Sequence, residues 1–428
     1  MSSKNNALLP KALVAAAAAA LLAVTGCSSD SGTSTGSTDT SKAEGRGPIT
    51  YVEGKDTTET GVVKQLIDQW NSTHPNEKVT FKEQTNSADQ QHDDLVQHLQ
   101  AKLSDYDVVA LDVPWTAEFA ANQWIQPLKE AFELNTSALI PATVASATYN
   151  GTLYAAPKNT NGGLLYYRKD LVPNAPATWA EMIASCPVAK QNNIGCYSGQ
   201  FKQYEGLTVN TAEAINSAGG KFVGPDGKTP VVDSPESRAG LQALVDGFKS
   251  GDIPAQAIEY DEPKSQEAFE KGQLLFLRNW PNVYASAEAD GSAVKGKVGV
   301  APLPGVNGKG TSTLGGYNVA ISAFSKNKAT ALDFLRYLIG EQAQRIIGES
   351  SLPPVLTSLY DDPALIEKMG YLPTLKEGIL NAVPRPVTPF YPAVSKAIQD
   401  NAYAALKGDK SVDQAIKDMQ AGIASAGK

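Results

Sequence analysis

Strand-like runs alternate with amphipathic segments through this chain, and this alternation is the feature that most restricts its fold. Residues 50–52, 79–81 and 106–111 have the composition of strands, and the last run is typical of a buried parallel strand. Between these runs, apolar residues recur at helical spacing, as in Val62, Val63, Leu66, Ile67 and Trp70. Helices that alternate with strands favour βαβ units, so the sequence predicts an α/β fold.

The same pattern continues beyond residue 160, where glycines precede further strand-like runs. We predict strands at 164–168, 274–277 and 317–321, and helices near 331–339, 394–406 and 412–423. From Pro48 to Lys428 the composition is that of a globular protein. At about 100–200 residues per domain, this length suggests two or three domains, and two large domains can enclose a cleft.

The chain begins with a hydrophobic leader. Lys4 and Lys11 precede or flank an apolar run over residues 12–24, which is shorter than the ~20 apolar residues of a membrane-spanning helix but suits a secretory signal. The leader ends in Val24-Thr25-Gly26-Cys27, which resembles the lipobox of bacterial lipoproteins. That resemblance implies a signal peptide over residues 1–26 and a lipid on Cys27. An ordinary signal peptide with an incidental cysteine is the alternative.

Residues 28–47 contain no large apolar side chain. Such a segment cannot bury enough surface to offset the entropy of ordering it. We therefore predict that residues 27–47 are the lipidated cysteine and a flexible tether, with a root-mean-square reach of roughly 25 Å. This places the protein on the extracellular face of the cytoplasmic membrane, anchored through Cys27.

The net charge of the whole chain is −8, and the leader holds two lysines and no acid, so cleavage leaves −8 − 2 = −10. A protein this acidic, without basic runs, is a poor binder of nucleic acid and of anionic membrane surfaces.

Two further cysteines, Cys186 and Cys196, have nine residues between them. In an exported protein this pair predicts a local disulfide, with two buried thiols as the alternative. The spacing does not fit a CxxC metal or redox motif.

Signals for catalysis, metals or cofactors are weak. His74, His92 and His98 are the only histidines, and the last two, six residues apart on a helix, do not share a face. Residues 32–36 match GxSxG, but they lie in the tether, where no strand and helix can form the nucleophile elbow. We expect no metal, no cofactor and no catalytic residue.

Planar polar and aromatic residues occur beside glycines and at strand ends. A sugar needs this mixture, because its C–H faces pack on aromatic rings while its hydroxyls need fixed donors and acceptors. Asp112, for example, follows a buried strand at the crevice position where open α/β sheets bind ligands. The predicted ligand-binding set is Asp112, Asn161, Trp280, Gly316, Tyr317 and Arg385, together with Asp56 and Gln84 in the loops after the first two strands.

These residues also have structural alternatives. Asp112 could cap the next helix, Asn161 could be a turn residue, and Trp280 could plug the end of a strand. Arg385 stands between two prolines and could lie on the surface of a loop. For that reason we expect the loss of Arg385 to affect folding much less than the loss of Trp280.

Four stretches together carry a resemblance to a known family: residues 61–81, 106–120, 154–171 and 329–344. In order and spacing they resemble the extracellular solute-binding proteins of ABC importers. Within these they are most similar to the carbohydrate-binding family of maltose- and trehalose/maltose-binding proteins, of the actinobacterial lipoprotein type.

The resemblance implies a two-lobed type II periplasmic-binding-protein fold, each lobe an α/β sandwich, with the ligand in the cleft between them. It assigns residues 48–163 and 315–365 to the first lobe, and residues 164–314 and 366–428 to the second. It also implies sugar contacts from Asp112, Asn161, Trp280, Gly316, Tyr317 and Arg385, although several relatives carry Trp in place of Tyr317.

The implied function is to bind an α-linked disaccharide of the trehalose or maltose type and to deliver it, as a monomer, to the membrane permease of an ABC importer. Two other classes remain open. A secreted glycoside hydrolase would need two carboxylates about 5–10 Å apart that face the scissile bond. An adhesion or scaffold lipoprotein would have no need of polar and aromatic groups at strand ends.

Overall fold

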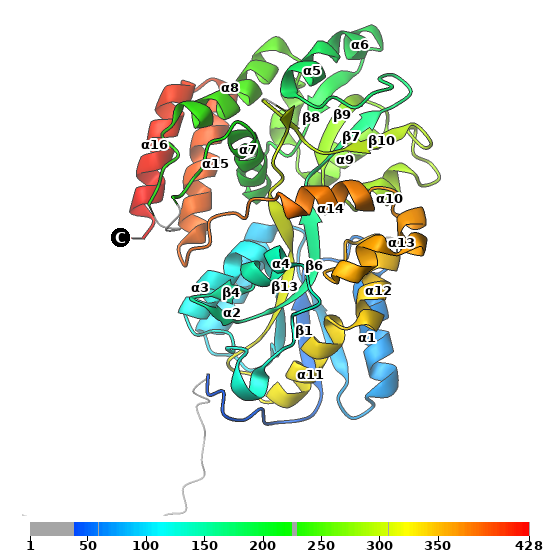
Figure 1. Ribbon diagram of the computed structural model, residues 1–428. Coiled ribbons are helices and arrows are strands. Elements are labelled where there is room, and N and C mark those ends of the chain that lie inside the picture. The colour runs from blue at the N-terminus through cyan, green and yellow to red at the C-terminus, as the bar shows by residue number, and fades with distance from the viewer. Residues whose placement is uncertain (1–37, 59, 225–228, 307, 428) are drawn as a thin grey trace, which may run out of the picture. The chain divides into compact units, whose positions relative to one another are not determined.

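The computed structural model describes residues 38–58, 60–224, 229–306 and 308–427. A five-stranded sheet organises the first part of the fold, in the order β2-β1-β3-β13-β6 (Figure 1). β1 is parallel to β2 and β3, whereas β13 is antiparallel to β3 and β6. These strands are β1 (Ile49–Glu53), β2 (Val79–Glu83), β3 (Val108–Asp112), β6 (Ala156–Gly162) and β13 (Leu314–Ile321).

A second, four-stranded sheet has the order β10-β7-β9-β8. Its strands are β7 (Leu164–Arg168), β8 (Gly195–Ser198), β9 (Leu274–Asn279) and β10 (Val298–Ala301). The chain changes sheet at Gly163, which separates β6 from β7, and again at Thr313, just before β13. Two sheets, each with its own helices, confirm the predicted α/β class and the type II architecture.

Helices cover the sheets because each has an apolar stripe to bury. In α1, for example, the five apolar residues that predicted this helix are all buried. The helices are α1 (Val62–Thr73), α2 (Ala88–Gln100), α3 (Thr116–Ala121), α4 (Pro141–Ser146), α5 (Trp179–Ala184), α6 (Cys186–Gln191), α7 (Glu205–Ser217), α8 (Pro235–Ser250), α9 (Glu262–Glu270), α10 (Val283–Ala287), α11 (Lys328–Leu338), α12 (Glu341–Glu349), α13 (Pro363–Lys368), α14 (Leu372–Leu380), α15 (Tyr391–Lys407) and α16 (Val412–Ser425).

Shorter elements connect them. These are the strands β4 (Thr148–Tyr149), β5 (Thr152–Leu153), β11 (Pro304–Gly305) and β12 (Gly308–Lys309), and the 3₁₀ helices Val113–Trp115, Glu130–Phe132, Ala255–Glu259 and Thr357–Asp361. Among the described residues, no helix is both long enough and apolar enough to span a bilayer.

The chain passes between the sheets a third time, in the segment from α14 to α15. Here Val383 N donates to Ser312 O at 2.9 Å, and Leu314 N donates to Val383 O at 3.1 Å. The third passage therefore lies beside the second. α14 itself packs on β6 of the first sheet, although it falls within the residues 366–428 that the sequence assigns to the second lobe.

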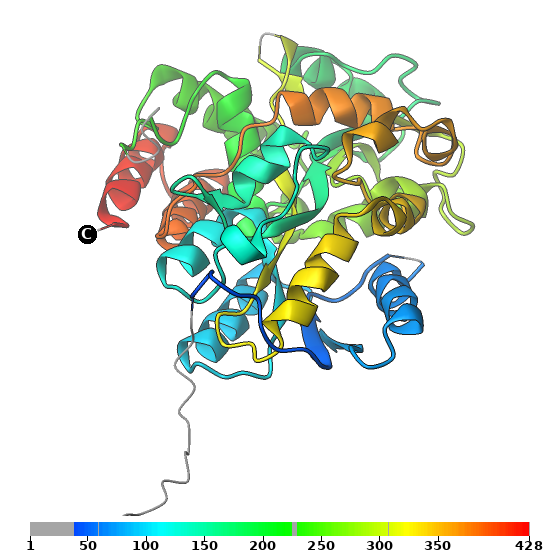
Figure 2. The same ribbon diagram turned by 60° about the horizontal axis from the view of Figure 1, so that its bottom comes forward.

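Residues 38–47, predicted as part of the flexible tether, pack against the folded protein. Thr40 Oγ1 donates to Glu130 Oε2 at 2.7 Å, and Arg46 forms ion pairs with Glu77 at 2.9 Å and Asp333 at 2.8 Å. The segment also hydrogen-bonds to the start of α11, beside which it lies in Figure 2. Composition alone misses this packing because backbone, hydroxyl and charged groups make most of the contacts, and Ala43 is a small apolar side chain that packs against the core. The rest of the predicted tether and the leader lie outside the described residues.

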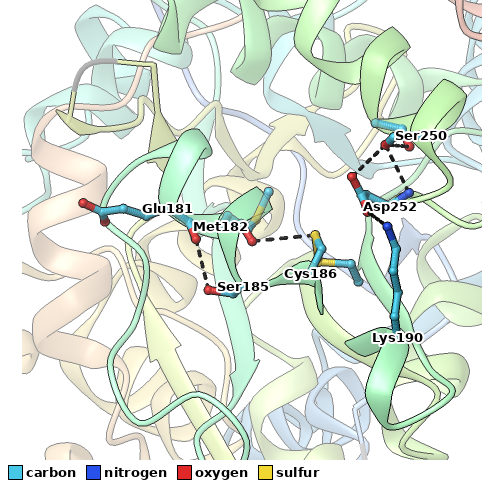
Figure 3. The surroundings of a disulfide bond; sticks show 9 residues. Glu181, Met182, Ser185, Cys186, Lys190, Ser250 and Asp252 are labelled. Carbon is cyan, nitrogen blue, oxygen red and sulfur yellow. Dashed lines mark hydrogen bonds and ion pairs between the residues drawn. A yellow bond between two sulfur atoms is a disulfide. The ribbon is translucent and has the colours of Figure 1, made fainter. Parts of the chain in front are cut away.

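The predicted disulfide between Cys186 and Cys196 is confirmed. It joins the first residue of α6 to β8, with a Cα–Cα distance of 5.1 Å, and both cysteines are buried. Farther along the same helix, Lys190 Nζ lies 3.1 Å from Asp252 Oδ1 (Figure 3). The disulfide and this ion pair hold the short helix α6 at both of its ends.

The double variant Cys186→Ala/Cys196→Ala should unfold with a free energy about 2–3 kcal/mol lower than that of the parent, since a short closed loop no longer restricts the unfolded chain. Urea unfolding measures the difference. A reducing agent should lower the stability of the parent by a similar amount and leave the double variant unchanged. Equal stability of the parent and the double variant would contradict the expectation.

Candidate functional site

Residues of the first sheet line a cavity of about 600 Å³, together with residues of α7, of α9 and of the segment that follows β9 of the second sheet. This volume lies within the range of ~300–1,000 Å³ that is usual for small-molecule sites. Of the eight predicted ligand-binding residues, Gln84 does not line the cavity. The other seven do: Asp56, Asp112, Asn161, Trp280, Gly316, Tyr317 and Arg385. The structure thus brings together residues up to 329 positions apart in the sequence, from Asp56 to Arg385 (385 − 56).

Asp112 is the last residue of β3 and stands opposite Tyr317 of β13 in the sheet. Its side chain makes no capping hydrogen bond to the 3₁₀ helix that follows, so the capping alternative does not describe it. Instead Arg385 donates to both carboxylate oxygens, from Nη2 to Oδ1 at 2.6 Å and from Nη1 to Oδ2 at 2.9 Å. Such a two-pronged pair fixes both groups in one plane.

The alternative that Arg385 lies on the surface of a loop is wrong, because only 4% of this residue is exposed. Nη1 also donates to Glu205 Oε1 at 2.6 Å, at the first residue of α7. Arg385 therefore lies between a carboxylate from the first sheet and a carboxylate from a helix of the second. Its Nε has no hydrogen-bond partner among the described residues.

Glu205 is a site residue that the sequence did not reveal. It accepts hydrogen bonds from the Tyr391 hydroxyl and from Ser395 Oγ as well as from Arg385. Burial raises the pKa of Glu205, Arg385 acts to lower it, and nearby Asp112 raises it. The nearest sequence signal is weak, since Glu205 resembles any acid in the first turn of a helix.

Asn161 lies within β6, opposite Gly315, and not in a turn. Asn159 is two residues earlier on the same strand and also lines the cavity. The side-chain oxygens of both asparagines are buried and have no hydrogen-bond partner among the described residues. Both can therefore accept hydrogen bonds from a ligand.

Glu53 and Lys158 form an ion pair at the wall of the cavity, and neither was predicted. The Tyr51 hydroxyl also donates to Glu53. A signal for Glu53 was present, because it is the last residue of β1 just as Asp112 is the last residue of β3. Nothing in the sequence pointed to Lys158.

Three aromatic residues line the cavity: Tyr204, Trp280 and Tyr317. Trp280 follows β9, and its indole Nε1 donates to Glu262 Oε1 at 3.4 Å. The Tyr204 hydroxyl donates to the same carboxylate. Burial, with the charges of Asp112 and Glu53, raises the pKa of Tyr317 far above its usual value, so its hydroxyl stays protonated.

Gly316 allows β13 to approach β6 closely. Its φ of +110° is rarely adopted by residues with a side chain, and a Cβ here would overlap the carbonyl oxygen of Asn159. The neighbouring Gly315 leaves room for the ring of Trp280, whose nearest carbon would lie 2.9 Å from a Cβ at that position. Gly316 therefore has a structural reason to be glycine, and its contact with a ligand stays a prediction.

Asp56 and Gln84, the two predicted residues in loops, differ in where their side chains lie. Asp56 lines the cavity and also holds the start of α1, since its carboxylate accepts from the backbone N–H groups of Thr58 and Val63, both at 2.9 Å. Gln84 donates to Asp94 Oδ2 at 2.7 Å and does not line the cavity. The inclusion of Gln84 in the predicted cleft is wrong, because its side chain turns toward α2.

Within the described ranges, no group of three or more His, Cys, Asp or Glu side chains could hold a metal ion. His92 contacts Glu118 at 2.7 Å and His98 contacts Asp105 at 2.6 Å. Burial acts to lower the pKa of His92, but the hydrogen bond and charge of Glu118 raise it overall.

The fold has two sheets with their helices, joined by three passages of the chain, and a polar and aromatic cavity lined by the first sheet and by helices and a loop beside the second. These features define a type II periplasmic binding protein. The family of bacterial extracellular solute-binding proteins matches residues 54–345, and the chain belongs to this family.

The chain is similar to a probable ABC transporter-binding protein of Deinococcus radiodurans, with 36% identity over 346 residues, which cover 77% of this chain and 81% of the relative. It is also similar to maltose-bound MalE3 of T. maritima, at 34% identity and a TM-score of 0.82, over 88% of this chain and 98% of that one. A Thermotoga lettingae ABC transporter solute-binding protein bound to α-D-tagatose has 25% identity and a TM-score of 0.80, over 89% and 99%. The first and third of these are named as binding proteins, and the second is named as maltose-bound.

Proposed function

We propose that this protein is the extracellular substrate-binding lipoprotein of an ABC sugar importer. Its ligand is an α-linked disaccharide of the trehalose or maltose type, which it delivers as a monomer to the membrane permease. The single observation that carries this proposal is the cavity of about 600 Å³, in which aromatic rings and fixed hydrogen-bonding groups from the first sheet and from the segments beside the second sheet face one space.

The lining suits a neutral, hydroxyl-rich ligand. Trp280 and Tyr204 offer ring surface to the C–H faces of a sugar. The side-chain oxygens of Asn159 and Asn161, which have no partner in the described part of the chain, can accept hydrogen bonds, and the carboxylates of Glu53 and Asp112 can accept more. Hydroxyl groups supply such donors, whereas a phosphate or carboxylate group would be repelled.

The first sheet contributes residues, and so do α7, α9 and the segment after β9, so a ligand contacts all of them only when the two parts are close together. A ligand stabilises whichever arrangement it contacts better, and closure around it excludes water. The maltose reported in MalE3, a structure 34% identical to this chain, supports a disaccharide as the ligand.

A thermal-shift screen with maltose, trehalose, glucose and a neutral tripeptide tests the proposal. Maltose or trehalose should raise the melting temperature, since each binds only the native state. Calorimetry should give a micromolar or lower Kd, about −8 kcal/mol or better. Binding of the peptide without binding of any sugar would overturn the proposal, and release of glucose from either disaccharide would favour the hydrolase instead.

The lipid anchor is the part of the proposal that rests on sequence alone, because Cys27 lies outside the described residues. The variant Cys27→Ser should be recovered in the medium and not with membranes, while its affinity for maltose equals that of the parent. Fractionation of cells that express each form makes the comparison, with calorimetry on both. A variant that still sediments with membranes would show that Cys27 is not the anchor.

A further inference from the structure

Beneath the cavity, Arg278 and Glu213 form an ion pair that no part of the proposed function has used so far. Arg278 Nε and Nη2 donate to the two carboxylate oxygens of Glu213, both at 2.6 Å. Nη1 donates to Gln200 Oε1 at 2.9 Å. Arg278 is 1% exposed and Glu213 is 5% exposed, so the guanidinium plane is held rigidly inside the protein.

The guanidinium of Arg278 lies over the ring of Trp280, with its central carbon 4.1 Å from the ring centroid. This is the geometry of a cation–π contact, and it covers one face of the indole. The edge of the ring meets Gly315 of the first sheet, and its N–H points to Glu262. With one face on Arg278, Trp280 has its other face available to the cavity that it lines.

Glu213 also contacts the passages of the chain between the sheets. Its Oε1 accepts a hydrogen bond at 3.2 Å from the N–H of Thr313, in the second passage. At the first passage, a Cβ on Gly163 would overlap Glu213 Oε1 and would lie 2.9 Å from Arg278 Nη2. The ion pair therefore fills the space that a side chain at residue 163 would occupy.

We propose that Arg278 is a positioning residue for Trp280, and that Glu213 ties this position to the first two passages between the sheets. The orientation of the ring then depends on the local geometry of Gly163 and Thr313, the segments about which the two sheets can move. This inference rests on the proposed function, because it assumes that Trp280 contacts the sugar.

Arg278→Lys tests the proposal, since a lysine keeps the charge and loses the planar fork and the stacked surface. Maltose affinity is measured in four proteins: the parent, Arg278→Lys, Trp280→Leu and the double variant. We expect Arg278→Lys to weaken binding about tenfold in the parent. In the Trp280→Leu background the same change should have almost no effect, because the residue through which Arg278 acts is gone.

A second variant disturbs the ion pair of Arg278 and Glu213 from the first passage between the sheets. Gly163→Ala should displace Glu213 and Arg278 and should weaken maltose binding in the same Trp280-dependent way. Gly378→Ala is its matched control, because a Cβ at that helical position meets no atom within 4 Å. Its maltose affinity should match that of the parent.

A readout without sugar separates this inference from the proposed function. The chain has five tryptophans, so labelling with 5-fluorotryptophan gives one fluorine resonance for each, and Trp280→Leu identifies that of residue 280. Arg278→Lys and Gly163→Ala should shift or broaden this resonance and leave the other four unchanged. An unchanged Trp280 resonance, or an equal loss of affinity with and without Trp280, would overturn the inference. If the parent binds neither maltose nor trehalose, the proposed function fails while the fluorine spectra still decide the positioning role.

Discussion

Replacement of Arg385 by alanine should lower the free energy of unfolding by about 3–5 kcal/mol, the usual consequence of removing one partner from a buried ion pair. Arg385 is the cation shared by Asp112 and Glu205. Without it, both carboxylates remain buried and repel each other. Urea unfolding of the sugar-free protein measures the loss, which reverses the expectation from sequence that this arginine contributes little to folding.

Arg345→Ala is the matched control for that measurement. Arg345 is also an ion-paired arginine, 3.0 Å from Asp362, but 38% of its side chain is exposed. Its loss should cost no more than about 1 kcal/mol. Because burial already raises the pKa of Glu205, the deficit of Arg385→Ala should become smaller in acid, where protonation removes the uncompensated charge. Equal stabilities of the two variants at neutral pH would contradict the assignment.

Local patterns predicted the elements of the fold well, because each depends on neighbouring residues. The predicted strand over Leu164–Arg168 has the same first and last residues as β7. The helix predicted from the apolar spacing that begins at Val62 is α1. One general rule also found part of the site: ligands gather at the carboxyl ends of strands in open α/β sheets, which is where Asp112 stands.

What the sequence could not show depends on pairs of residues that are distant along the chain. Arg385 and Asp112 are 273 residues apart, and nothing local to either indicates that the third passage lies beside the end of β3. Glu205 and Lys158 were missed for the same reason, since their partners come from other elements. Gln84 shows the opposite error, because a loop after a strand can turn its side chain away from the cleft.

Trp280→Ala should weaken binding of maltose or trehalose by about 2–4 kcal/mol, the range for a buried aromatic anchor. The alanine removes the ring that lies between Arg278 and the cavity, and with it the N–H that reaches Glu262. Calorimetry measures the loss. Trp179→Ala is a suitable control, because Trp179 packs on Tyr197 and does not line the cavity, so its loss should leave affinity unchanged.

The conservative variant Trp280→Phe separates the two contributions of this side chain. A phenyl ring keeps a flat face for the sugar and a surface for the guanidinium of Arg278, but it cannot donate a hydrogen bond to Glu262. We therefore expect Trp280→Phe to recover most of the affinity that Trp280→Ala loses, because stacking depends on the face and not on the N–H. If the phenylalanine variant binds as weakly as the alanine variant, the hydrogen bond to Glu262 matters more than the ring face. If neither variant differs from the parent, the sugar does not lie against Trp280.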